Sequence, residues 1–277
     1  MDKKDIVVVV PIYLPALSEM EAVSLKQCLD ILSDYSIVII KPENLDISNI
    51  QSQFLLPKVI SFPDRCFQGI EAYNRLMLDV AFYRTFSSYT YMLVYQLDAY
   101  AFKDELFFWA SLGYDYIGAP WMPHQRKYWR FPTRFVWFVQ RCFWSIFYPK
   151  NLRRMKYCWF HVGNGGFSLR KISKMIAVTE HYKAIIDKCM ADSNSFFPED
   201  VFLLLNTHDK EVHLKRPSYK LAMKFAIEQI PAWSYRANGC QLPFGCHNWT
   251  HPEMLPFWSQ FIKLGYCLLY TSPSPRD

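Results

Sequence analysis

The distribution of apolar residues along the chain predicts alternating strands and helices in its first half. Residues 5–12 form a β-branched apolar run, which indicates a first strand. A capping box formed by Ser18 and Glu21 then opens a helix that is expected to run to about Leu32. A second short strand is expected over residues 35–40. This order of strand, helix and strand predicts a βαβ unit and therefore a parallel sheet.

A strong strand signal in the middle of the chain ends in an acid. Residues 91–100 read YMLVYQLDAY, a short apolar run that follows a helix expected over residues 67–86. Open α/β sheets bind ligands at the carboxyl ends of their strands, so Asp98 stands where an acid can hold a metal ion or face a phosphate. The alternative is that Asp98 only caps the next helix, expected over residues 104–112.

The composition is that of a globular protein with a large core. The chain has 277 residues, of which 51% are hydrophobic and 18% aromatic, and this suits one large α/β domain over residues 1–266. Eight cysteines without CxxC spacing indicate reduced thiols of the cytosol, and the N-terminal segment lacks the features of a secretory signal. Residues 267–277 read CLLYTSPSPRD, as one reading frame of a sequencing-library adaptor would, so we interpret this tail as an artefact.

The basic residues concentrate in one aromatic segment. The net charge is +6, yet residues 124–156 contain nine Lys and Arg and no acid, so the remainder is net acidic. Within this segment the run at 135–148 is too short to span a bilayer, which needs about 20 apolar residues. Aromatic rings flanked by basic side chains favour an interfacial helix on anionic lipid. A helix packed on the core and an oligomer contact are the alternatives, and without a nucleic-acid-binding motif we expect no nucleic-acid partner.

A glycine-rich run opens the chemistry of the second half. Residues 161–170 read HVGNGGFSLR, and glycines without side chains let a backbone approach a ligand closely. Asn164 offers both a donor and an acceptor, which suits sugar hydroxyl groups. The alternative is a tight hairpin turn, because Asn-Gly is a strong turn signal.

Two adjacent acids precede an apolar helix. Residues 197–200 read FPED, and carboxylates at a helix start are stabilised by the helix dipole, which is a sufficient structural explanation. In the functional interpretation one of Glu199 and Asp200 is the general base that accepts the proton of an attacking hydroxyl group. The other carboxylate then holds an acceptor hydroxyl.

A late histidine is a candidate metal ligand. His247 lies within LPFGCHNW, where it can complete the coordination of a divalent ion together with Asp98 and a diphosphate. Mn²⁺ accepts one imidazole among oxygens, whereas Mg²⁺ prefers oxygens only. A structural histidine is the alternative. Cys240 and Cys246 lack a second pair, so we do not expect zinc.

Four further residues are candidates for donor binding. Tyr13 and Glu43 follow the first two expected strands, where an aromatic ring and a carboxylate suit a nucleotide base and ribose. Asn74 and Arg75 lie on the helix expected over residues 67–86, from which they either reach a phosphate or face solvent. Solvated loop residues are the alternative for the first pair.

These motifs together resemble a known family. QLDAY, YDYIGAPW, VGNGGFSLR, PEDVF and PFGCHNW occur in this order within residues 6–265. The set resembles a bacterial domain family, domain of unknown function 5672, which is placed among GT-A-fold glycosyltransferases of capsule and lipopolysaccharide gene clusters. The resemblance implies an α/β fold with a Rossmann-like mixed sheet flanked by helices. Residues 122–156 would form a basic aromatic helical insertion into this fold.

The resemblance also implies an activity and a site. The chain would move a sugar from a nucleotide-diphosphate donor to a hydroxyl of a surface glycan or a lipid-linked acceptor, in the cytoplasm or at the inner face of its membrane. Asp98 stands at the metal-binding Asp-x-Asp position, but Asp98-Ala99-Tyr100 lacks the second acid, so Mn²⁺ or Mg²⁺ would also need His247. A non-catalytic module that binds carbohydrate or a membrane surface is the alternative. The implied donor- and acceptor-binding residues are Tyr13, Glu43, Asn74, Arg75, Gln96, Trp121, Asn164, Gly165 and Gly166.

Overall fold

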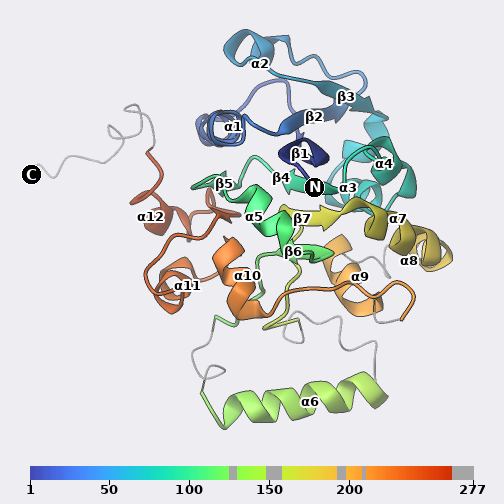
Figure 1. Cartoon of the computed structure of the whole chain (residues 1–277), viewed down its shortest axis with the longest axis vertical. Coiled ribbons are helices and arrows are strands. Elements are labelled where there is room, and N and C mark those ends of the chain that lie inside the picture. The colour runs from blue at the N-terminus through green and yellow to red at the C-terminus, as the bar shows by residue number, and fades with distance from the viewer. Residues whose placement is uncertain (125–129, 148–157, 192–197, 208–209, 264–277) are drawn as a thin grey trace, which may run out of the picture.

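A mixed sheet forms the frame of the computed structural model, which describes residues 1–124, 130–147, 158–191, 198–207 and 210–263. The six strands follow the order β3-β2-β1-β4-β7-β6 (Figure 1). Four neighbouring strands are parallel: β1 (Ile6–Pro11), β2 (Ser36–Pro42), β3 (Val59–Phe62) and β4 (Tyr91–Tyr95). Strand β7 (Phe167–Lys171) is antiparallel to β4 and to β6 (Tyr116–Gly118).

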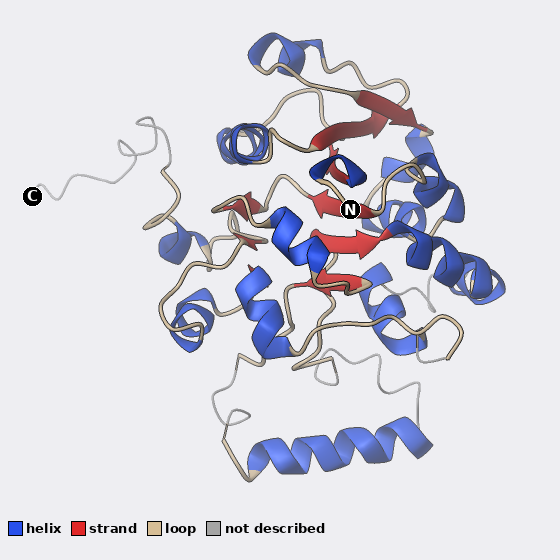
Figure 2. Ribbon diagram, in the orientation of Figure 1, coloured by secondary structure: helices blue, strands red, loops and turns tan. Residues whose placement is uncertain are grey.

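Helices cover both faces of this sheet, because its central strands are apolar on both sides (Figure 2). All of β1 is buried, and its side chains alternate between two cores, with Val7 and Val9 in one and Ile6 and Val8 in the other. The first core packs against α3 (Ile70–Met77), α4 (Val80–Thr85), α7 (Ile172–His181), α8 (Lys183–Ala191) and α9 (Glu199–Asn206). The second packs against α1 (Glu19–Ile31), α2 (Ser48–Gln53), α5 (Leu106–Ser111) and α10 (Tyr219–Phe225).

The predicted βαβ unit is confirmed, including the Ser18–Glu21 capping box of α1. The single helix expected over residues 67–86 is wrong. A 3-10 turn (Asp64–Phe67), α3 and α4 occupy this region, and α4 starts afresh because the Asp79 carboxylate accepts a hydrogen bond from the Ala81 N–H. Leu78 and Asp79 therefore separate two helices.

The strand expected over residues 91–100 ends earlier, at Tyr95. A turn follows, in which the N–H of Ala99 donates to the carbonyl of Gln96, and Asp98 lies in this turn. Helix α5 begins at Leu106 without a side-chain cap, so Asp98 does not cap it. The capping alternative for Asp98 is therefore wrong.

A small second sheet brings the end of the chain back to the first. It has the order β5-β9-β8, with β5 (Tyr100–Ala101), β9 (Gly245–Cys246) and β8 (Ala226–Ile227). Strands β8 and β9 are parallel with Ile227 opposite Cys246, so the residues that follow them, Glu228 and His247, emerge side by side. Helices α11 (Pro231–Ala237) and α12 (Leu255–Trp258) lie around this sheet (Figure 1).

The basic aromatic insertion contains a helix, α6 (Thr133–Phe147), which lies beyond β6 at one end of the molecule (Figure 1). No helix in the described part of the chain is long and apolar enough to cross a membrane. The seven cysteines of the described residues are free thiols. Several predictions fall outside the described residues, namely the artefact tail 267–277 and the basic residues Arg126, Lys127, Lys150, Arg153, Arg154 and Lys156.

Candidate active site

A cavity of about 840 Å³ opens at the edge of the main sheet where β1 and β4 end. Because β7 is antiparallel to β4, its first residue lies at this same edge, with Phe167 opposite Tyr95. The turn after β4 and the glycine-rich run before β7 therefore meet here. The cavity is lined by the predicted residues Tyr13, Asn74, Gln96, Asp98, Asn164, Gly165, Gly166, Glu199, Asp200 and His247.

Two predicted donor-binding residues lie elsewhere. Glu43 is exposed beyond the end of β2, where its N–H donates to the carbonyl of Phe62, and it does not line the cavity. Trp121 is only 2% exposed and belongs to the core. Its ring fills the space beside Gly163, where an added Cβ would lie 2.1 Å from it. Glu43 and Trp121 therefore lie outside this cavity.

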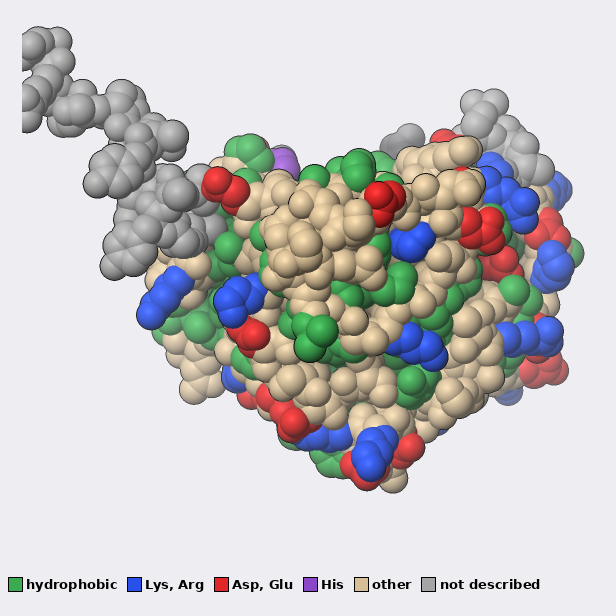
Figure 3. All heavy atoms as spheres, turned by 90° about the horizontal axis from the view of Figure 1, so that it is seen from above, with side chains coloured by type: hydrophobic (Ala, Val, Ile, Leu, Met, Phe, Trp, Pro, Cys, Tyr) green, Lys and Arg blue, Asp and Glu red, His purple; other side chains and the backbone are tan. Residues whose placement is uncertain are grey.

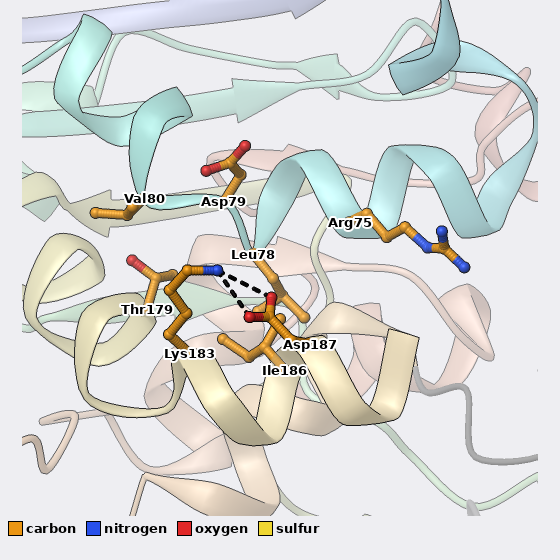
Figure 4. Close-up of a pocket in the computed structure, with 8 residues that line it drawn as sticks. All are labelled: Arg75, Leu78, Asp79, Val80, Thr179, Lys183, Ile186 and Asp187. Carbon is orange, nitrogen blue, oxygen red and sulfur yellow. Dashed lines mark hydrogen bonds and ion pairs between the residues drawn. The ribbon is translucent and has the colours of Figure 1, made fainter. Parts of the chain in front are cut away.

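Arg75 is also outside this cavity. Successive residues of a helix point about 100° apart, so Asn74 and Arg75 cannot both face the same site. Asn74 is buried, whereas Arg75 is exposed and borders a separate surface cavity between α3 and α8 (Figure 4). Figure 4 shows its side chain pointing away from the ion pair of Lys183 and Asp187. Helical geometry therefore places Arg75 beside a different cavity from Asn74.

His247 lies between two carboxylates. Its Nε2 is 3.2 Å from Asp98 Oδ1, and its Nδ1 is 3.3 Å from Glu228 Oε1. Gln96 Oε1 lies 3.2 Å from the same Nε2, and Asn164 Nδ2 donates to Glu228 Oε1 at 2.8 Å. The four groups around the imidazole come from the turn after β4, the run before β7 and the end of β8.

The charges around this imidazole determine its protonation. Burial disfavours the imidazolium, but the carboxylates of Asp98 and Glu228 outweigh burial and raise the pKa of His247 to about 10. Burial likewise opposes the charged form of Asp98, and the neighbouring His247 outweighs it, so the pKa of this carboxyl is below its usual value. The two side chains therefore form a stable ion pair in the cavity.

Gly166 is required by the close approach of these groups. A Cβ at this position would lie 2.0 Å from His247 Nε2 and 2.5 Å from Gln96 Oε1. The predicted tight hairpin is not found, because the antiparallel strands β6 and β7 are joined by residues 119–166 and not by the Asn-Gly turn. Close packing of backbone against side chains explains this glycine.

The carboxylate of Glu199 is held at one of its two oxygens. Arg170, which is 0% exposed, donates from Nη2 to Glu199 Oε1 at 2.5 Å and from Nη1 to the Tyr83 hydroxyl at 2.8 Å. The N–H of Glu199 donates to Asn74 Oδ1 at 2.6 Å, so Asn74 caps α9 from a neighbouring helix. Among the described residues Glu199 Oε2 has no hydrogen-bond partner although it is buried. This buried oxygen therefore lacks the hydrogen bond that such an atom normally makes.

Asp200 has a different environment from Glu199. Its Oδ1 accepts a hydrogen bond from the Val201 N–H at 2.7 Å. Burial raises the pKa of Asp200 well above its usual range, and the nearby charges of Glu199 and Glu228 raise it further. The two adjacent acids thus differ, because Glu199 is held in an ion pair whereas the raised pKa of Asp200 favours its protonated form.

The comparisons with known proteins give the family and the fold of this chain. A family model described as "Protein of unknown function (DUF5672)" matches residues 57–247, well over half of the chain. The chain belongs to the DUF5672 family. No curated protein sequence matches it.

Solved structures show the fold of this DUF5672 protein. An active-site mutant of LgtC has a TM-score of 0.51 at 14% identity, covering 87% of this chain and 86% of that one. Mouse xyloside xylosyltransferase 1 has a TM-score of 0.50 at 11% identity, covering 87% and 96%. Core-mannan synthase A from Aspergillus fumigatus, in its Mn/GDP form, has a TM-score of 0.45 at 10% identity, covering 73% and 69%, and is too distant to support an argument. The expected GT-A fold, a mixed sheet flanked by helices, is confirmed.

The site of this DUF5672 protein includes two residues that were not predicted from the sequence. Arg170 belongs to the glycine-rich motif, and it was detectable as a charged residue within an otherwise buried strand. Glu228 follows β8, a strand of two residues that leaves no periodic signal in the sequence. Only the pairing of β8 with β9 places Glu228 beside His247.

We expect Asp200→Asn to change how the stability of this DUF5672 protein depends on pH. A carboxyl group whose pKa is raised in the folded state binds more protons there than in the unfolded chain. Its contribution to the free energy of unfolding therefore falls as the pH rises above about 4 toward the raised folded pKa. Urea denaturation between about pH 5 and pH 8 should show a flatter pH dependence in Asp200→Asn than in the wild type.

The surface variant Asp187→Asn is the matched control for this measurement, because Asp187 lies on α8 in an exposed pair with Lys183. Its stability curve should run parallel to that of the wild type. If the Asp200→Asn curve also ran parallel, burial would not be holding a proton on Asp200.

Proposed function

We propose that this protein is a glycosyltransferase that moves a sugar from a nucleotide-diphosphate donor to a hydroxyl group of a surface glycan or a lipid-linked acceptor. The observation that supports it most is that Asp98, Glu199 and His247, far apart in sequence, line one cavity. This cavity lies at the carboxyl ends of β1 and β4, where open α/β sheets bind their ligands. A GT-A fold is compatible with this function and does not by itself establish it.

The size and lining of the cavity suit such a donor. Its volume of about 840 Å³ lies in the range of small-molecule sites, which is roughly 300–1,000 Å³. Tyr13 is 52% exposed at the cavity and offers a ring on which a nucleotide base can stack. Hydroxyl groups of a sugar can pair with the buried, unpaired Oε2 of Glu199.

The one cationic side chain of the described lining, His247, is already paired with Asp98, so a diphosphate would need a further cation here. Among the described residues that line the cavity, Glu21, Asp98, Glu199 and Asp200 are acidic and none is Lys or Arg. The described residues hold no cluster of three His, Cys, Asp or Glu that could bind a metal ion alone. A divalent ion would therefore share its coordination with the diphosphate.

Once His247 gives up the proton that it carries in the pair with Asp98, its Nε2 and the oxygens beside it fit such an ion, because only the neutral imidazole coordinates a metal. Asp98 Oδ1 and His247 Nε2 lie 3.2 Å apart, and Gln96 Oε1 is beside them. Glu228, on the other ring nitrogen, is placed to orient the imidazole, as carboxylates do next to metal-bound histidines. One imidazole among oxygens suits Mn²⁺ better than Mg²⁺. When bound, the ion would neutralise negative charge on the departing diphosphate.

The paired acids would act on the acceptor. Glu199 Oε2 would accept the proton of the attacking hydroxyl group, while Arg170 holds Oε1 and fixes the carboxylate. Asp200 in its protonated form would donate a hydrogen bond to a sugar oxygen. A base on the side of the sugar opposite the diphosphate would give a product of inverted configuration. A product of retained configuration would remove this role from Glu199.

A non-catalytic carbohydrate-binding module is the second candidate function. The observation that favours it is that Asp98-Ala99-Tyr100 has one acid where the metal-binding motif of the fold has two. A module of this kind would bind a sugar or nucleotide sugar in the cavity without releasing nucleoside diphosphate.

We further propose that the protein acts in the cytoplasm, at the inner face of the cytoplasmic membrane.

A thermal-shift screen of nucleotide sugars, each with and without Mn²⁺, tests the proposed function. A ligand that binds only the folded state at about 100 times its Kd adds about 2.7 kcal/mol to the free energy of unfolding. For a domain of this size the melting temperature should rise by about 5–10 °C. We expect at least one nucleotide sugar to do so with Mn²⁺, and assays should detect release of its nucleoside diphosphate. No shift with any of them would contradict the proposal, and a shift without release would favour the binding module.

A further inference from the structure

Helix α6 carries an apolar face that is turned outward. Five of its large apolar side chains are about half exposed: Phe135 at 56%, Val136 at 50%, Phe138 at 53%, Val139 at 49% and Phe143 at 49%. A surface helix normally places its apolar side chains toward the core. In the described part of the chain no element covers this face, and Figure 1 shows α6 at the edge of the molecule.

The inward face of α6 attaches the helix to the rest of the protein. Trp137 is 6% exposed and packs edge-on against Phe160, with ring centroids 5.4 Å apart. The guanidinium of Arg134 lies 4.4 Å from the centroid of Phe160 and 5.3 Å from that of Tyr219. These contacts attach α6 to Phe160 and to Tyr219 of α10.

A basic groove lies between this inward side and the apolar face, since Phe135 and Phe138 also line it. Its volume is about 560 Å³, and its lining combines aromatic rings with Arg134, Arg141 and His161. Within the described ranges Arg134 makes no salt bridge, and no Asp or Glu lines the groove. A cationic groove beside an outward apolar face matches a molecule that has both an anionic and an apolar part.

At the opposite end of the molecule, basic and apolar side chains do not form separate surfaces. Figure 3 looks on the face opposite α6, where basic, acidic and apolar side chains are interspersed in small groups. Leu55, which follows α2 at that end, is 95% exposed but stands without an apolar cluster comparable to α6. The apolar face of α6 is therefore a local feature that needs its own explanation.

We propose that α6 docks on an anionic membrane, with its outward side chains at the boundary between headgroups and acyl chains. Arg134 then compensates a lipid phosphate at the border of the helix. A second copy of the chain fits less well, because residues 124–156 carry nine basic residues and no acid, and two such segments would repel each other. This docking does not depend on the proposed glycosyl transfer.

Sedimentation of the full chain with lipid vesicles tests the docking. We expect binding to vesicles that contain about one third phosphatidylglycerol and at least about tenfold weaker binding to phosphatidylcholine alone, because each basic residue adds to the attraction. Val139→Glu, which places a charge on the outward face, should weaken binding by about tenfold or more. Arg134→Gln should weaken binding to the anionic vesicles by about fivefold.

Leu55→Glu is the matched control, since it puts the same charge on an exposed apolar position at the opposite end of the molecule. It should bind vesicles as the wild type does, and circular dichroism should show that all three variants are folded. Equal binding to neutral and anionic vesicles, or an equal loss in Leu55→Glu, would overturn the proposal. Light scattering that shows a wild-type dimer, a Val139→Glu monomer and no vesicle binding would assign the face to a second copy instead, and would equally overturn it.

Discussion

Arg170→Met is expected to lower the free energy of unfolding by about 3–5 kcal/mol, which is a large fraction of the stability of most domains. Arg170 is 0% exposed and its partner Glu199 is 5% exposed. Removing the guanidinium leaves the Glu199 carboxylate buried without its counter-charge, and it also removes the hydrogen bond to the Tyr83 hydroxyl. Urea denaturation of the two proteins measures the difference.

A second arginine provides the control for this prediction. Arg84 on α4 pairs with Glu180 on α7, but both side chains are largely exposed, so Arg84→Met should cost less than about 1 kcal/mol. Arg170→Met combined with Glu199→Leu should recover much of the loss, because no charge then remains buried. If Arg170→Met cost no more than Arg84→Met, the ion pair would not be holding the acid in place.

Glu199→Gln is expected to lower turnover by about 10²–10⁴-fold, the usual contribution of a general base. The amide keeps the shape of the side chain, and its oxygen can still accept the hydrogen bond from Arg170 at the start of α9. It cannot accept a proton from an acceptor hydroxyl group. Binding of the nucleotide should persist, because Asp98 and His247 are unchanged. Release of nucleoside diphosphate, measured with a donor that stabilises the wild type, gives the turnover.

Glu180→Gln is the control for this variant, since Glu180 lies exposed on α7, outside the cavity lining. Its turnover should equal that of the wild type. Turnover of Glu199→Gln within about twofold of the wild type would show that another group accepts the proton.

Much of the main sheet and its first helix could be predicted because the sequence patterns that specify these elements are local. The β-branched run of β1 is buried on both faces, and the capping box of α1 forms as its sequence indicates. The position of Asp98 at a carboxyl edge also follows from local pattern, since β4 is a continuous apolar run. The glycine-rich motif reaches the same edge because β7 is antiparallel to β4, which sequence alone does not establish.

The features of the site that the sequence did not predict depend on the direction of individual side chains and on the pairing of strands that are far apart in the sequence. Arg75 and Trp121 lie close in sequence to residues of the cavity or its motifs, yet helix geometry turns one outward and the core buries the other. Glu228 reaches His247 only through the pairing of two strands of two residues each. Such short strands have too few residues to show a period of two.

Calorimetric titration of the stabilising nucleotide sugar or its nucleoside diphosphate, with Mn²⁺, is the most direct test that the cavity around Asp98 and His247 is the donor site. The variants to compare are Asp98→Ala in this cavity and Lys183→Ala in the separate cavity beside α8 (Figure 4). We predict binding to the wild type and to Lys183→Ala with the same Kd, and a loss of at least about tenfold in Asp98→Ala. Unchanged binding to Asp98→Ala would contradict the assignment of this cavity as the donor site.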